Sequence, residues 1–86
     1  MKKVDFVIRE YVSKLQFDTL RYLSDRFKNR MGSDIAEAVD VLSKSVEMDR
    51  ILASARDSEE FFNNLDLIAA AVEREYNRRI PDLVGV

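Results

Sequence analysis

The sequence predicts an all-α fold, a small helical bundle, from three observations. The 86 residues include only two glycines and one proline, so the turn chemistry that a multistranded sheet needs is scarce. Strong helix formers such as Ala, Leu, Glu, Arg and Lys are frequent. Apolar residues recur with the spacing of helix faces instead of alternating as in strands. The length predicts a single domain, at residues 1–80, followed by a C-terminal tail at 81–86.

Start and stop signals divide the chain into three main helical segments, at about 3–31, 34–56 and 58–79. We expect Gly32 to end the first segment in a left-handed conformation and Ser33 to cap the second. Asp57 and Glu60 have the spacing of a capping box at the start of the third. Pro81 is expected to stop that segment, because proline cannot donate the next backbone hydrogen bond.

The apolar faces of these segments differ in number. The third has one face, formed by Phe61, Leu65, Ile68, Val72 and Tyr76. The first has two faces, rotated by roughly 130°: Val4, Val7, Ile8, Tyr11, Val12 and Leu15, then Leu20, Leu23, Phe27 and Met31. The middle segment also has two, rotated by roughly 140°: Ile35, Ala38, Val39, Leu42 and Val46, then Val41, Met48, Ile51, Leu52 and Ala55.

Two arrangements explain the doubled faces. Each segment can break, near Gln16 to Asp18 and near Ser43 to Ser45, which gives five shorter helices; the polar residues there compete for backbone hydrogen bonds. Alternatively, each is one long helix with two buried faces, one of them covered by a second copy of the chain. The absence of Gly and Pro at both positions supports this second arrangement. It is the favoured one, and it predicts a bundle completed by homodimerisation.

Missing residue types exclude several kinds of chemistry. There is no Cys and no His, which excludes disulfides, thiolate nucleophiles, zinc fingers and His-based triads. Apolar runs are too short to span a membrane, and the N-terminus shows no signal-peptide pattern, so we expect a cytoplasmic protein. We predict no catalytic residue, metal site or cofactor. A metal site or enzyme built from carboxylates is the least favoured alternative, since solvated helix faces explain the acids.

One stretch carries a pattern of two helices: Ile35-Ala36-Glu37-Ala38-Val39-Asp40-Val41, then Ser43-Lys44-Ser45-Val46 and Arg50-Ile51-Leu52. It resembles the helix-turn-helix of bacterial repressors, which place the second helix in the major groove. The resemblance implies, as an alternative function, a DNA-binding transcriptional regulator with a degenerate motif at about 34–52 and nucleic-acid contacts from Lys44 and Arg50. Asp40 stands where the pattern usually has Gly, and Glu47 and Asp49 would face phosphate.

Two apolar surfaces are candidates for binding a protein partner: Met48, Ile51 and Leu52, and separately Leu67, Ala71 and Arg74. The first exists if the middle helix is continuous. In the second, Leu67 lies on a face that we expect to be solvent-exposed, and Ala71 permits close approach of another helix. The favoured function is therefore a small non-enzymatic interaction or regulatory protein that binds another protein through helical surfaces.

Overall fold

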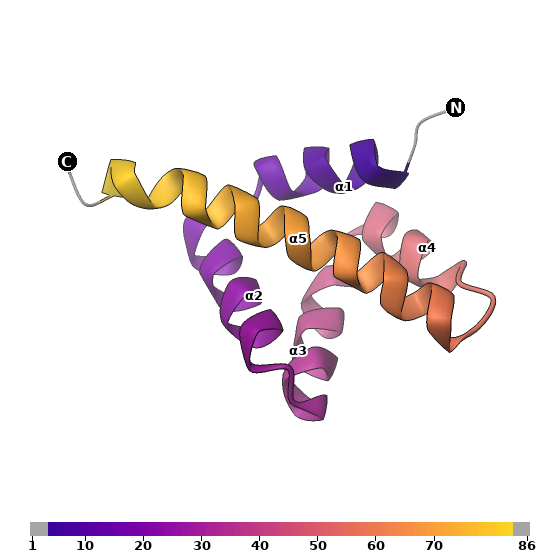
Figure 1. Cartoon of the computed structure of the whole chain (residues 1–86). Helices are drawn as coiled ribbons and strands as arrows, with labels where there is room; N and C mark the ends of the chain where they lie inside the picture. Colours follow the sequence, from indigo (N-terminus) through magenta and orange to yellow (C-terminus); the bar gives the residue numbers. More distant parts are fainter. Residues whose placement is uncertain (1–3, 84–86) are drawn as a thin grey trace.

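The computed structural model describes residues 4–83, with side chains described for 4–80. Five helices follow one another: α1 (Val4–Ser13), α2 (Phe17–Asn29), α3 (Gly32–Leu42), α4 (Val46–Ala53) and α5 (Ser58–Leu83). Helices and the turns between them account for this whole range, which contains no strand. The predicted all-α bundle is thus confirmed. The longest helix, α5, runs across the other four (Figure 1).

The first two predicted segments each divide into two helices. The chain leaves the helical conformation at residues 14–16 and 43–45, close to the two predicted breaks. The Ser45 hydroxyl accepts a hydrogen bond from the Met48 amide at 3.4 Å and so caps α4. The alternative with continuous long helices is therefore wrong. Its argument for a dimer also fails, because each break turns the second apolar face, except for the exposed Met31, onto the chain's own core.

The turn between α2 and α3 lies earlier in the sequence than predicted, at residues 30–31. Arg30, with a φ of 56°, is the left-handed residue that ends α2, whereas Gly32 is already the first residue of α3. Met31 occupies the N-cap position, without a side-chain cap. The predicted roles of Gly32 and Ser33 are therefore wrong. Because α2 ends at Asn29, the reversal falls on an arginine, where glycine is the usual residue.

The two ends of α5 differ from each other in how well the sequence predicts them. The Asp57 carboxylate accepts a hydrogen bond from the Glu60 amide at 2.9 Å, as the capping box predicts. The Glu60 carboxylate, however, accepts a hydrogen bond from the Arg56 amide at 3.5 Å, whereas in a full capping box it would accept one from the Asp57 amide. At the other end α5 continues through Pro81 to Leu83, so the predicted stop is wrong. The φ that proline imposes is compatible with a helix, although proline removes one backbone hydrogen bond and crowds the carbonyl group four residues before it. Residues 84–86 of the predicted tail lie outside the described range.

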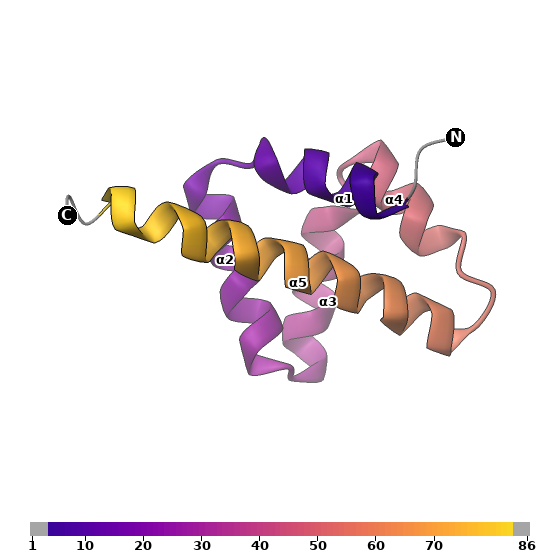
Figure 2. The ribbon, with the colours of Figure 1, turned by 45° about the horizontal axis from the view of Figure 1, so that its top comes forward.

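Apolar residues from all five helices form one core: Ile8, Val12, Leu20, Leu23, Phe27, Ala38, Leu42, Met48, Ile51, Leu52, Leu65, Ile68 and Val72. The predicted face of the last helix is confirmed, with Leu65, Ile68 and Val72 buried and Phe61 and Tyr76 packed against them. Helix α2 packs on α5 and α3, α1 packs on α5 and α4, and α4 packs on α5 (Figure 2). α5 thus packs most extensively on α1, α2 and α4 and organises the core.

Candidate partner-binding site

The structure separates the two predicted partner surfaces. Met48, Ile51 and Leu52 are at most 9% exposed and belong to the core. They contact the protein's own chain because the break before α4 turns their face toward α5 and α1. These three residues are therefore not an exposed surface, in contrast to the sequence prediction for a continuous middle helix.

The second surface is exposed and lies on α5. Leu67 is 44% exposed, Arg74 is exposed and Ala71 is partly buried. Spacings of four and three residues place the three side chains in one row along the helix. Ala71 and Arg74 also line a pocket of about 210 Å³ between α1 and α5, together with Arg9, Val12, Ser13, Glu75 and Arg78. We call this pocket and the adjoining Leu67 the α1/α5 groove.

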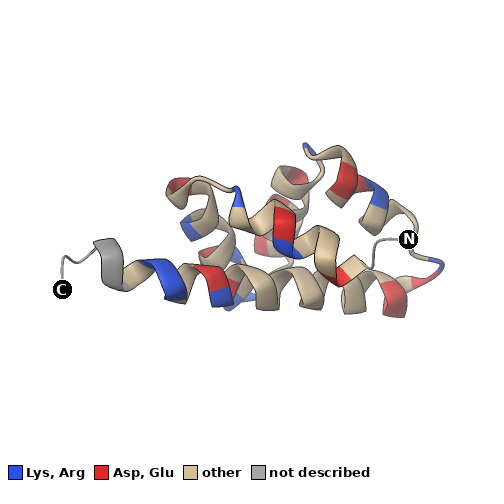
Figure 3. Ribbon diagram, turned by 90° about the horizontal axis from the view of Figure 1, so that it is seen from above, with Lys and Arg blue, Asp and Glu red and all other residues tan. Residues whose placement is uncertain are grey.

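The α1/α5 groove is more basic than the rest of the protein. Its lining residues and their ion-pair partners carry four arginines and two acids: Arg9, Arg74, Arg78, Arg79, Asp5 and Glu75. The excess is two positive charges, whereas the whole chain has a net charge of −2. Elsewhere, acidic and basic residues are interspersed over the helices (Figure 3).

The arginines of the groove differ in their partners. Arg9 pairs with Asp5 at 3.2 Å, and Arg78 pairs with Glu75 at 2.6 Å. Within residues 4–80, Arg74 makes no ion pair and no side-chain hydrogen bond. Arg74 is therefore the guanidinium that can accept a new anionic partner without first losing one.

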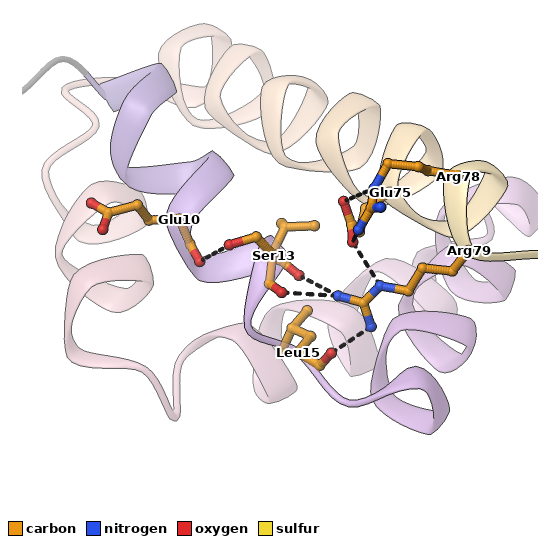
Figure 4. A network of polar contacts seen from close by, with 7 residues as sticks. Glu10, Ser13, Leu15, Glu75, Arg78 and Arg79 are labelled. Carbon is orange, nitrogen blue, oxygen red and sulfur yellow. Dashed lines mark hydrogen bonds and ion pairs between the residues drawn. The ribbon is translucent and has the colours of Figure 1, made fainter. Parts of the chain in front are cut away.

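Arg79 holds the two walls of the groove together (Figure 4). Its guanidinium donates to the carbonyl oxygens of Leu15 at 2.6 Å, Ser13 at 3.0 Å and Val12 at 3.4 Å. Carbonyl groups at the C-terminal end of a helix lack partners within that helix, so this arginine acts as a cap for α1. Its Nε also donates to Glu75 at 2.6 Å. The side chain is 19% exposed, which leaves it committed to the fold.

Glu75 is held in its charged form by these arginines. The hydrogen bond from Arg78 is the largest cause of a pKa below the ordinary value, and burial works against it. The hydrogen bond from Arg79 lowers the pKa further. Glu75 therefore orients both guanidinium groups, and a ligand in the groove would meet Arg74 as its available cation.

The sequence reasoning missed Arg79, Arg9 and Arg78 as members of this site. Arg79 lies 64 residues from Leu15 in the chain, and no local pattern connects an arginine to carbonyl groups at such a distance. The row of Leu67, Ala71 and Arg74, by contrast, follows from helical spacing alone. Sequence therefore identified one wall of the groove, and the packing of α1 supplied the other.

The residues of the helix-turn-helix alternative lie on α4 and on the turn before it. Lys44 and Arg50 are both exposed, but they line different pockets. Glu47 and Asp49 are exposed on the same short helix as Arg50. α3 packs chiefly on α2, whereas α4 packs on α5 and α1. DNA binding stays a prediction.

The side chains described at residues 4–80 include no group of three or more metal-ligating residues placed to hold an ion. None of the helices in this range combines the length and hydropathy needed to cross a bilayer.

Comparisons with protein families, curated proteins and solved structures give no significant match to this chain.

Proposed function

We propose that this chain is a non-enzymatic interaction protein that binds an acidic, amphipathic segment of another protein in the α1/α5 groove. The observation that carries the proposal is Arg74, an exposed arginine without an acidic partner in residues 4–80, beside Leu67 and Ala71. An apolar side chain of the partner would contact Leu67 and Ala71. A carboxylate one turn away would pair with Arg74.

Physical chemistry supports this pairing of ligand and site. Arginine presents a planar fork of donors that binds a carboxylate through two hydrogen bonds. The local positive excess lies on a protein of net negative charge, so it favours acidic segments at this groove over other parts of the surface. The contacts of Arg79 with α1 fix the groove before any partner arrives, which lowers the entropy cost of binding.

Selection from a random peptide library displayed on phage, with the full chain as target, tests the proposal. We expect the selected peptides to combine carboxylates with a large apolar residue. The variants Leu67→Asp and Arg74→Glu should each weaken their binding by tenfold or more, measured by fluorescence anisotropy. Val46→Asp and Arg21→Glu are matched controls, because they make the same changes at exposed positions on α4 and α2.

Two outcomes would contradict the proposal. In the first, the selected peptides lack acidic residues. In the second, the Leu67 and Arg74 variants bind the peptides as well as the wild type does, and circular dichroism shows that their helices are intact. If the protein instead retards a short DNA duplex at low salt, and Lys44→Ala and Arg50→Ala abolish this retardation, the DNA-binding alternative is supported.

A further inference from the structure

A second exposed apolar surface lies between the α2–α3 turn and the N-terminal half of α5. It surrounds a pocket of about 210 Å³ whose apolar lining is Phe27, Ile35, Phe62, Leu65 and Ala69. Phe62 is 53% exposed, and Met31 in the adjoining turn is 64% exposed. We call this region the Phe62 surface. Exposed aromatic and methionine side chains around a pocket are typical of protein interfaces.

One charge of each sign borders this pocket. Arg30 stands on the side of the α2–α3 turn, and Asp66 stands on the side of α5. Within residues 4–80, neither side chain forms an ion pair or a side-chain hydrogen bond. Opposite charges on two sides of an apolar centre are self-complementary, because a two-fold rotation exchanges them.

The backbone of Arg30 gives a further reason to examine its side chain. Its φ of 56° lies in the left-handed region, where a residue other than glycine is strained. Glycine would end α2 more favourably at this position. Strain that is retained at a residue whose side chain has no partner within the chain suggests that the side chain acts elsewhere.

We infer that the Phe62 surface binds a second copy of this chain in an isologous dimer. Arg30 of each copy pairs with Asp66 of the other, and Phe62 of each copy packs against the facing apolar surface. The inference does not depend on the proposed acidic partner, because it uses other residues on another side of α5. Helical rotation places Phe62 and Asp66 on average roughly 110° from Leu67 and Arg74.

The dimer has a functional consequence. We expect both α1/α5 grooves to stay accessible in this dimer, because their pockets share no lining residue with the pocket of the Phe62 surface. The dimer would therefore present two copies of the groove, and a partner with two acidic segments would bind more tightly through multivalency.

Charge reversal tests the two-fold arrangement, with sedimentation velocity from micromolar to millimolar protein as the readout. The wild type should dimerise within this range. Arg30→Asp and Asp66→Arg should each weaken dimerisation at least tenfold, because every cross-chain pair then joins like charges. An equimolar mixture of these two variants should recover the dimer, since each pair between unlike chains again joins opposite charges.

Further variants separate the interface from the fold. Phe62→Asp should abolish dimerisation without recovery by either charge variant, while Val46→Asp and Arg21→Glu should leave it unchanged. Circular dichroism at low concentration checks that every variant stays helical. A wild type that is monomeric at the highest concentration overturns the inference. So does a dimer that Arg30→Asp leaves intact, or a mixture that fails to recover the dimer.

Discussion

The two halves of α5 are held in different ways. The C-terminal half is fixed by directional contacts: Arg79 binds carbonyl groups of α1, and Tyr76 stacks on Phe17 with ring centroids 5.6 Å apart. The N-terminal half packs through apolar contacts, chiefly of Leu65 and Ile68. It also leaves Phe62 half-exposed.

This difference shows how one helix can serve both folding and binding. Hydrogen bonds from a guanidinium to fixed carbonyl groups allow one geometry, so the C-terminal half sets the position of α1 and the shape of the α1/α5 groove. The hydrophobic effect does not depend on direction, so it does not require every apolar side chain to meet one specific partner. The N-terminal half is therefore packed on one face while other apolar side chains, such as Phe62, stay exposed. The proposed dimer would use that surface.

The largest expected effect is at Ile68, which is fully buried and lies where the two halves meet. Ile68→Ala should lower the free energy of unfolding by about 2–5 kcal/mol, because it leaves a cavity that the core fills only partly. Urea unfolding followed by circular dichroism measures this change. Leu67→Ala, at the neighbouring exposed position, is the control and should cost much less. Equal losses would mean that Ile68 is not a core residue.

The second prediction concerns a substitution that should weaken only the C-terminal half of α5. Arg79→Ala should lower the free energy of unfolding by about 2 kcal/mol, because two carbonyl groups of α1 and one in the turn after it lose a charged donor. Hydrogen exchange should accelerate in α1 and in the end of α5 but stay slow in α4. Arg78→Ala removes a more exposed arginine beside it and should cost less than about 1 kcal/mol. Similar losses for the two variants would show that the carbonyl contacts contribute little.

The third prediction concerns the turn beside the N-terminal half. Arg30→Gly should raise the free energy of unfolding by roughly 0.5–1 kcal/mol, since glycine adopts a positive φ without steric strain. The same variant removes the cation of the Phe62 surface and should weaken dimerisation. Unfolding measured at low concentration and sedimentation measured at high concentration should therefore move in opposite directions. A gain in stability with unaltered dimerisation would leave Arg30 with a structural role only.

The smallest expected effect is a pH dependence confined to the C-terminal half. The pKa of Glu75 in the folded protein lies below its ordinary value of 4.5, chiefly because of the hydrogen bond from Arg78. Its carboxylate therefore stabilises the fold fully above that ordinary pKa, and this contribution disappears as the pH falls through the lower folded pKa.

Comparison with Glu75→Gln isolates this contribution. The difference in unfolding free energy between the wild type and Glu75→Gln should be constant near neutral pH and shrink below about pH 4.5. Glu73→Gln, at an exposed neighbouring position, is the charge-matched control. A difference that is independent of pH would show that the arginines do not shift the ionisation of Glu75.

Local signals in the sequence account for the helices and for part of the site. The single apolar face of the last helix identified Leu65, Ile68 and Val72 as core, because helical spacing alone fixes which side chains share a face. The same spacing placed Leu67, Ala71 and Arg74 in one exposed row. Met48, by contrast, is buried and not a surface residue, because its exposure depends on where α4 points after the break at 43–45.

Local sequence patterns were enough to predict that this protein is helical, which helix faces are apolar and which residues compete for backbone hydrogen bonds at each break. These properties depend on contacts within a few residues along the chain. The packing of the helices was needed to establish that both breaks occur, that Arg79 reaches the end of α1, and that Arg30 and Asp66 border one pocket. Those contacts join residues tens of positions apart, and their geometry is set by the packing of whole helices around a shared core.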